Sequence, residues 1–273
     1  MIRSRADGSL RGRRRSLAAA VLVLAAAAAP AAAQTGYENT SQRRPVRIED
    51  AHPTEHRSLV FQIAPLELEL EEDVELDVTL TPELIYGIVP STHVGIAIPI
   101  ALNDVGDTSP GSASLEGIDL QVLHKLKEEG RGLPAFSVRG DLWIPAGGLS
   151  PEKVHPALTG LATRSFGRSR VNVNAQYTFV NEDDSNASEL SRWLVGASVD
   201  RKYPHRSLLL SVSFSVNEPL GEGVQYNADA GIRKKVNSRL SLDAALSGTL
   251  AGEDDSSVSV TFGGAYALVR ARR

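Results

Sequence analysis

A strict alternation of apolar and polar residues, kept up over long runs, is the feature that most constrains this sequence. In residues 171–179 the odd positions hold Val, Val, Ala, Tyr and Phe, and the even positions hold Asn, Asn, Gln and Thr. Successive side chains of a β-strand point to opposite faces, so this stretch predicts a strand with one apolar and one polar face. The same period of two returns in residues 208–217, 224–233, 240–247 and 258–268. The fold class is therefore all-β.

The first half of the chain shows the same pattern, in residues 76–88, 94–100, 118–127, 136–144 and, further on, 193–203. Two more stretches, 58–70 and 156–166, are apolar enough for strands, but the sequence does not settle how they pair. In the second of them, Leu158 and Leu161 fall on opposite faces. Counting both stretches gives about twelve strands.

The connections between these strands alternate between short and long. The short ones are residues 90–92, 167–169, 204–205 and 237–238, and the long ones are about 103–114, 146–155, 181–189, 217–222 and 250–256. Outer-membrane barrels combine short periplasmic turns with longer outside loops. The alternation predicts an up-and-down antiparallel order with both ends of the barrel domain on the periplasmic side. Arg168, Arg170, Arg206, Lys234, Lys235 and Arg239 are placed at the short turns.

Strand length favours a membrane barrel over a soluble sandwich. The runs are about 10–13 residues long, whereas a tilted membrane strand needs roughly 9–11 residues and soluble strands average about 5–6. After residue 33 no apolar run is long enough for a membrane helix, and only helices and closed barrels satisfy the backbone in lipid. Residues 58–273 are therefore predicted to form a transmembrane barrel. A soluble periplasmic β-sandwich stays the alternative, because alternation does not show which face looks outward.

The first 33 residues are predicted to be a signal peptide. Four arginines between Arg11 and Arg15 precede an apolar run at 17–29, and three alanines, 31–33, form a small-residue cleavage site. This order predicts export, with the bacterial outer membrane as the destination of a barrel.

Cleavage there would leave an acidic chain that begins with a polar stretch. Lys+Arg would fall from 29 to 23 and Asp+Glu from 33 to 32, for a net charge of −9, which argues against nucleic acid as a partner. Residues 34–57 are predicted to be a flexible periplasmic N-terminal linker. His52 and His56 in it are interpreted as solvated, not as metal ligands. The chain has no cysteine, so disulfides and thiol chemistry are excluded.

Several charged residues fall on the polar face of the predicted strands. In a membrane barrel that face lines the lumen, and ten residues are predicted to lie there: Asp77, Glu83, Asp119, Lys125, Arg139, Asp141, Asp200, Lys202, Arg233 and Asp243. They either line a polar path for solutes or fill the lumen with salt bridges and close it. The sequence leaves both interpretations open. Their mixed signs argue against strong selection for anions or cations.

Three segments resemble a known outer-membrane family. Glu75–Ile100, ELDVTLTPELIYGIVPSTHVGIAIPI, resembles the opening hairpin of the family named for the meta-pathway of phenol degradation. Phe136–Gly147 resembles its strand that ends in a proline and a glycine, and Ser165–Phe179 resembles the next hairpin. The resemblance spans roughly residues 60–268. It implies a transporter-like barrel associated with aromatic compounds and implies no enzymatic activity.

No catalytic, cofactor or metal site is predicted. The His-x-Ser-Asn cluster of the outer-membrane phospholipases is missing, and no serine and histidine are spaced as a nucleophile and its base. The acidic runs at 183–184 and 253–255 lack the spacing of a calcium loop.

The expected function is that of a passive channel or transporter-like barrel for small solutes, which the resemblance extends to aromatic or apolar ones. The alternative is a closed structural or binding barrel. Expected partners are outer-membrane lipids, the barrel-assembly machinery and a small-molecule solute. The sequence fixes neither the solute nor the oligomeric state.

Overall fold

The computed structural model describes residues 39–41, 44–70, 76–103, 112–180, 184, 190–220, 223–251 and 257–269. The predicted signal peptide lies outside the described residues. Within the described part no helix is long and apolar enough to cross a membrane.

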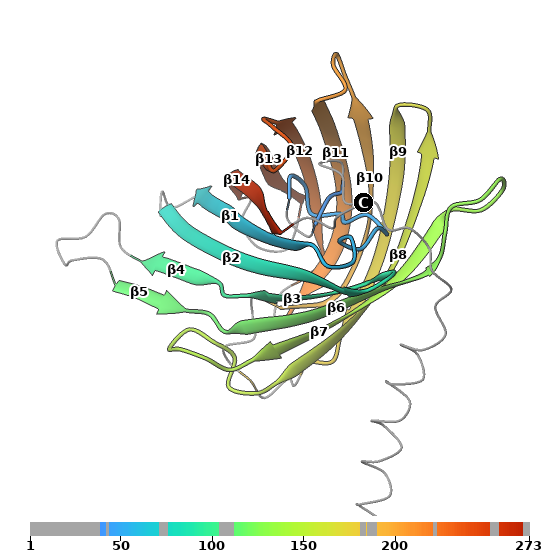
Figure 1. Ribbon diagram of the computed structural model, residues 1–273. Helices are drawn as coiled ribbons and strands as arrows, with labels where there is room; N and C mark the ends of the chain where they lie inside the picture. Colours follow the sequence, from blue (N-terminus) through green and yellow to red (C-terminus); the bar gives the residue numbers. More distant parts are fainter. Residues whose placement is uncertain are drawn as a thin grey trace, which may run out of the picture. The chain divides into compact units, whose positions relative to one another are not determined.

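The described chain is built from β-strands joined in sequence order (Figure 1). The strands are β1 (Leu59–Leu70), β2 (Leu76–Val89), β3 (Thr92–Ala97), β4 (Ile100–Asn103), β5 (Ser112–Leu115), β6 (Ile118–Lys127), β7 (Ala135–Ile144), β8 (His155–Phe166), β9 (Ser169–Thr178), β10 (Ser191–Lys202), β11 (Leu208–Pro219), β12 (Gln225–Lys235), β13 (Leu240–Ala251) and β14 (Val258–Val269).

These segments make one closed antiparallel barrel of twelve strands. β2 pairs with both β3 and β4, β3 pairs with β6, and β4 pairs with β5. Two pairs of segments, β3 with β4 and β5 with β6, are therefore single strands with a short break. β1 pairs with β2 on one side and with β14 on the other, where Leu59 lies opposite Val269. Through β1 the first and last strands of the barrel are joined, as a closed wall in lipid requires, and the predicted fold class is confirmed.

The two stretches whose pairing the sequence left open now have definite partners. β1 runs beside β2 and β14 with a register shift between Ile63 and Leu66. β8 pairs with β7 and β9. Leu158 is 54% exposed on the outer face, whereas Leu161 is 2% exposed on the inner face. The mixed parity of the two leucines of β8 therefore arises because Leu161, an apolar side chain, points inward.

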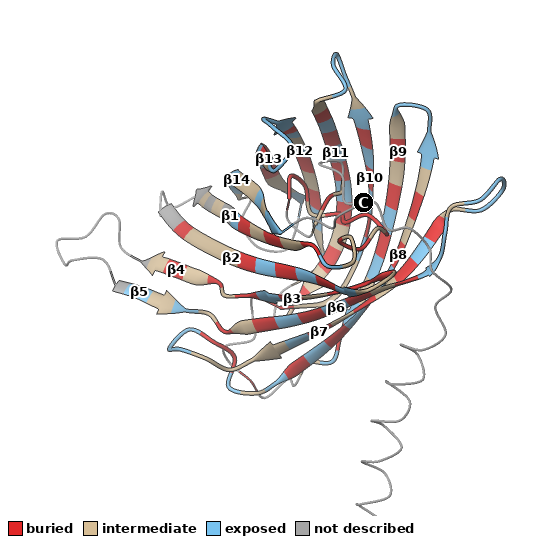
Figure 2. Cartoon of the chain, viewed as in Figure 1, coloured by how far each residue is buried: buried red, intermediate tan, exposed pale blue. Residues whose placement is uncertain are grey.

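The two faces of the barrel wall differ sharply in chemistry. On β9, Val173 and Tyr177 are 44% and 49% exposed, whereas Asn172 and Asn174 are 0% and 4% exposed. Figure 2 shows the same alternation of buried and exposed residues along the other strands. Apolar side chains thus cover the outside and polar ones face the lumen. This is the arrangement of a membrane barrel and the reverse of a soluble sandwich.

The turns at the two ends of the barrel also differ. One end holds residues 90–91, 128–134, 167–168, 203–207 and 236–239, together with the start of β1 and the end of β14. The other end holds longer connections such as 145–154 and 179–190. The alternation follows the prediction except at 128–134, a longer connection among the short turns. The two ends are called the turn end and the loop end below.

Candidate functional site

A chain segment before β1 lies inside the barrel (Figure 1). It comprises residues 39–41 and 44–58 and is called the plug. Val46, Ile48 and Ala51 are at most 1% exposed, and Asp50 is fully buried. This differs from the flexible linker predicted for 34–57. The physical reason is that the inner wall is polar. Its side chains form hydrogen bonds and ion pairs with the backbone and the charged groups of the segment, in place of the water that would surround a flexible linker.

The plug follows the inner wall around the barrel from β13 to β2. Arg44 contacts β13, Arg47 contacts β12, Glu49 contacts β9 and β7, and Thr54 contacts β3. At its end, His56 forms a parallel β-bridge with Gly87 of β2. The partner residues on β3, β7, β8 and β9 lie mostly within a few positions of the turns. The plug therefore occupies the half of the lumen nearest the turn end.

Side chains of the wall replace the hydrogen bonds that the plug backbone would make in a sheet. Asn174 accepts from the Glu49 N–H at 2.7 Å and donates to the Glu49 carbonyl at 2.8 Å. The Ala51 N–H donates to Thr163 Oγ1 at 2.8 Å, and Ser137 Oγ donates to the Ala51 carbonyl at 2.6 Å. A buried backbone needs such partners, so these three side chains specify where the plug lies.

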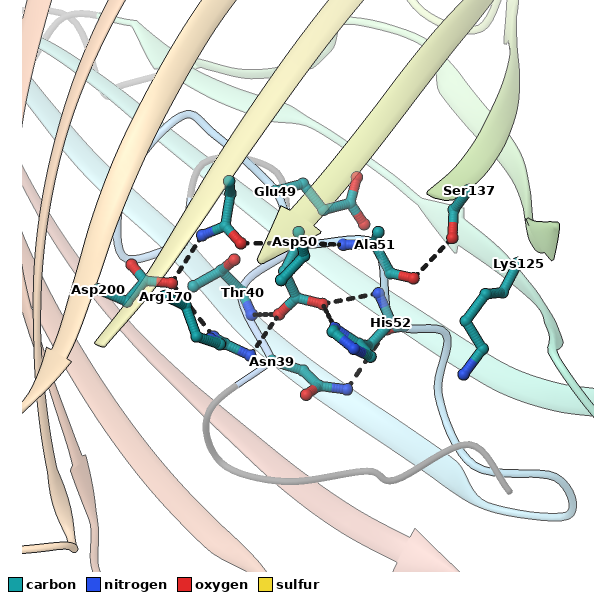
Figure 3. A network of polar contacts seen from close by, with 12 residues as sticks. Asn39, Thr40, Glu49, Asp50, Ala51, His52, Lys125, Ser137, Arg170 and Asp200 are labelled. Atoms are coloured by element: carbon teal, nitrogen blue, oxygen red, sulfur yellow. Dashed lines mark hydrogen bonds and ion pairs between the residues drawn. The ribbon is translucent and has the colours of Figure 1, made fainter. Parts of the chain in front are cut away.

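Asp50 is the central anion of the plug (Figure 3). Its carboxylate accepts from the Thr40 N–H at 2.7 Å and from the His52 N–H at 2.8 Å, and it lies 3.4 Å from Arg170 Nη1. Although burial alone would raise the pKa of Asp50, Arg170 and the hydrogen bond from His52 lower it below its usual value. Arg170 also contacts Asp200 at 3.1 Å. Asp50 is therefore held as a carboxylate.

A second charged group surrounds Arg139 on β7. The guanidinium contacts Glu49 of the plug through Nη1 and Asp141 through Nε, the latter at 2.9 Å. Glu83 of β2 accepts from Gln121, and Asp119 of β6 also faces Arg139. Burial raises the pKa of the Glu49 carboxyl to about 8, more than Arg139 lowers it, and Asp141, Asp50 and Glu83 raise it further. Glu49, Glu83, Asp119, Asp141 and Arg139 are called the acid cluster.

Two further ion pairs hold the first part of the plug. Arg44 bonds to Asp243 of β13 and to Gln62 of β1. Arg233 contacts the same Asp243 at 3.3 Å and donates to the Arg44 carbonyl at 3.0 Å. Arg47 lies 3.3 Å from Asp229. Buried charges are tolerated only when paired. These ion pairs therefore determine where the first part of the plug lies against the wall.

Glycines on the inner face of the wall make room for the plug. A Cβ on Gly231 of β12 would lie 2.7 Å from Pro45 Cβ, and one on Gly87 of β2 would overlap the Glu55 carbonyl. A Cβ on Gly196 of β10 would overlap the end of Ile48. Real Cβ atoms do not approach so closely, so a side chain at any of these positions would displace the plug or its neighbours.

Ala51 also forms an apolar anchor. It is fully buried in a cluster with Leu123 of β6, Ala135 of β7 and Leu161 of β8. These wall residues point into an otherwise polar lumen. They remove apolar surface of the plug from water and oppose its release.

The structure places most of the ten predicted lumen residues on the inner face. Eight of them are at most 9% exposed: Glu83, Asp119, Lys125, Arg139, Asp141, Asp200, Arg233 and Asp243. Lys202 is half-buried near the turn end. The side chain of Asp77 lies outside the described part of the structure.

The predicted lumen residues do not form one connected site. Lys125 pairs with Glu128 at 2.6 Å. Most of the others contact the plug or one another, and Arg233 also lines the cavity beside the plug. Sequence reasoning missed Arg170, which it placed at a turn, and it also missed Asn174, Thr163 and the whole plug side of the site.

At the loop end, two long connections are joined by a buried pair. His155 Nε2 lies 2.9 Å from Asp184 Oδ2, and both side chains are fully buried. Asp184 also accepts from the N–H groups of Glu152 and Lys153 at 3.0 and 2.9 Å. This residue of the predicted acidic run therefore ties loop to loop. The other acidic loop residues lie outside the described ranges, in which no group of three His, Asp or Glu residues is arranged to hold a metal.

The space left beside the plug is small. A cavity of about 70 Å³ lies between the plug and the wall, lined among others by Thr40, Gln62, Ile85, His93 and Arg233. Pockets that hold small molecules are typically about 300–1,000 Å³. The plug therefore leaves no room for a solute at this cavity.

No family profile and no curated protein matches the sequence. The backbone is similar to an outer-membrane channel from Pseudomonas putida F1, with a TM-score of 0.57 and 11% identity over 80% of this chain and 98% of that one. It is also similar to the KdgM porin, with a TM-score of 0.52 and 8% identity over 78% of this chain and 99% of that one. The fold is that of an outer-membrane β-barrel. At such low identity the likeness shows the fold alone.

Proposed function

We propose that this protein is a passive outer-membrane channel for small polar solutes, closed at rest by its own plug. The observation that carries the proposal is the closed barrel with an apolar outer face and a polar inner face. A wall of this kind separates lipid from a hydrated path. The plug occupies that path near the turn end, so solutes pass when it moves.

The location follows from the same features. The exposed apolar band requires lipid around the barrel, and the predicted signal peptide provides export. In outer-membrane barrels the short turns face the periplasm, so the plug would be reached from the periplasm and the His155–Asp184 clasp from outside. Barrel-assembly machinery and outer-membrane lipids are the partners that this placement requires.

The chemistry of the wall supports polar solutes better than aromatic or apolar ones. Near the loop end a row of uncharged groups crosses the inner wall from β10 to β13: Asn217 donates to Ser191, Asn227 donates to Asn217, and Thr249 donates to Asn227. Such amides and hydroxyls bind solutes by exchanging hydrogen bonds. The resemblance to the phenol meta-pathway family supports a transporter-like role, and membership of that family is part of the proposal.

We assign no enzymatic activity. The buried His155–Asp184 pair holds two loops together through backbone hydrogen bonds. In the P. putida channel and the KdgM porin the same fold is described as a channel or porin, which is consistent with this role.

A closed structural barrel is the second candidate, because the ion pairs between plug and wall favour a permanently filled lumen. Under that function, replacing Arg139 and Asp141 by Ala destabilises the barrel and leaves its permeability unchanged. Under the channel function the same change loosens the plug and raises conductance.

The deciding experiment is planar-bilayer conductance of the full chain with a removable lock on the plug. The chain has no cysteine, so Ala51→Cys with Ala135→Cys, two members of the apolar anchor, is designed to form one disulfide from plug to wall. Oxidation is expected to abolish channel openings and reduction to restore them, while each single variant behaves like the native chain. Equal conductance in the oxidised and reduced states would show that the plug does not block the path of solutes. If the native chain inserts and never conducts, the structural barrel is the remaining candidate.

A further inference from the structure

The acid cluster holds more carboxyl groups than cations. Four carboxyls, those of Glu49, Glu83, Asp119 and Asp141, surround the single guanidinium of Arg139. All five side chains are at most 9% exposed. Buried carboxylates packed together disfavour one another's ionised form, and burial raises the pKa of Glu49, the plug member of the group, to about 8.

The other buried cations near the plug are already engaged elsewhere. Arg44 and Arg233 share Asp243, Arg170 is held by Asp50 and Asp200, Arg47 by Asp229, and Lys125 by Glu128. Arg44 acts on Glu83 only through space. The described cations therefore leave the acid cluster with an excess of negative charge when every carboxyl is ionised.

Glu49 is the member of the acid cluster that moves with the plug. The other four members belong to the wall, so the excess of carboxyls is complete only while the plug is in place. Seating the plug brings Glu49 from water, where its pKa is about 4.5, to a site where burial raises its pKa to about 8. Between those values the seated state binds a proton that the released state does not.

We propose that the plug is held in the lumen by a proton on the acid cluster, and that loss of this proton releases the plug and opens the channel. This inference deepens the proposed function by naming its regulation. The sign follows from linkage: a carboxyl whose pKa is raised in the seated state favours seating at low pH, and this advantage is lost as pH rises through about 8. For one group the effect is at most about tenfold per pH unit.

Asp50, the second buried carboxyl of the plug, acts in the opposite sense and at a different pH. Asp50, whose pKa is lowered, favours seating as a carboxylate, so its contribution is lost only when the solution is more acidic than its ordinary value of 3.8. It faces Arg170, which also contacts Asp200, and it faces His52 of the plug itself. Release on the alkaline side therefore does not come from Asp50, and the Glu49→Gln variant tests whether it comes from the acid cluster.

The test measures plug release directly, by the reactivity of one introduced thiol. Ala51 is fully buried while the plug is seated. In the full-length protein in lipid vesicles, the thiol of Ala51→Cys should therefore react when the plug is released. Its labelling by a water-soluble maleimide is expected to accelerate by about tenfold per unit from about pH 6 to about pH 8. Thiols ionise with pH, so rates are divided by those of Ser238→Cys in an exposed turn at the same end.

Glu49→Gln removes the titratable group and keeps the shape of the side chain. When it is combined with Ala51→Cys, the thiol should therefore be labelled slowly at both pH values. Glu152→Gln, which alters an exposed carboxyl, should keep the native response. An unchanged pH response in Glu49→Gln, or no response in the native background, overturns the proposal. Retained resistance to heat in mild detergent shows that each variant has folded. Labelling is measured without conductance. If the plug is released with rising pH in a barrel that never conducts, the channel function is rejected, and the control of plug release by a proton still holds.

Discussion

Arg44 and Asp243, 199 residues apart in the sequence, form a buried ion pair that joins the plug to β13. Arg233 contacts the same carboxylate from β12. One carboxylate thus contacts two guanidinium groups, and the first part of the plug depends on it.

Asp243→Asn is therefore expected to weaken the plug more than Arg44→Ala. The first change leaves two buried guanidinium groups without their carboxylate, and breaking a buried pair in this way costs roughly 3–5 kcal/mol. The second change removes one guanidinium group, and Asp243 keeps its contact with Arg233. The check is trypsin cleavage after Arg47, a bond that the seated plug protects. Equal cleavage in both variants would contradict the sharing of Asp243.

The inner glycines give a steric test that leaves the charges alone. Gly231→Val is expected to displace the plug, because the nearest atoms to its new Cβ all belong to Pro45. Channel conductance and cleavage after Arg47 should both increase, and the barrel should stay folded. The matched control is Gly140→Val, where the nearest neighbour of a new Cβ, the Ala157 carbonyl oxygen, is 4.0 Å away. If the bond after Arg47 stays protected from trypsin in Gly231→Val, β12 moves to accommodate the side chain and the glycine is not required for the plug.

The two leucines of β8 test the apolar anchor. Leu161→Ala removes a side chain that is 2% exposed against Ala51, and such a change costs roughly 2–5 kcal/mol. Leu158→Ala, on the same strand but 54% exposed on the outer face, loses only contact with lipid or detergent. Thiol labelling at Ala51→Cys should rise in the first variant alone. If both variants label at the same rate, the anchor does not hold the plug.

The barrel itself was predictable from sequence because a single physical rule fixes it. Side chains alternate across a strand, so the parity of Val173 and Asn172 assigned the two faces once the membrane was inferred. The inward direction of Arg139, Asp141 and Asp243 followed from the same rule. Pairing of β1 and β8 did not follow, since bulges and inward apolar residues break parity.

The plug was not predictable by that rule, because its 39–58 stretch has no period and its partners lie on strands far away in sequence. Composition alone made it resemble a solvated linker. Signals were nevertheless present. Leu123 and Leu161 are apolar at inward positions, and Gly87 and Gly231 are empty at inward positions. A lumen filled only by water explains neither, whereas a segment packed inside explains both.

The loop clasp predicts which side of the membrane each end faces. Asp184→Asn keeps the size of the side chain but replaces one of two acceptor oxygens with a donor, opposite His155 and the N–H groups of residues 152 and 153. Leaving buried groups unpaired costs roughly 1–3 kcal/mol, so loop 145–154 should loosen and trypsin should cut after Lys153. In intact cells this cut should occur with protease added outside, whereas cleavage after Arg47 in Gly231→Val should require access to the periplasm. Both cuts from the same side would contradict the orientation on which the channel proposal rests, because the turn end and the loop end of a closed barrel lie on opposite sides of the bilayer.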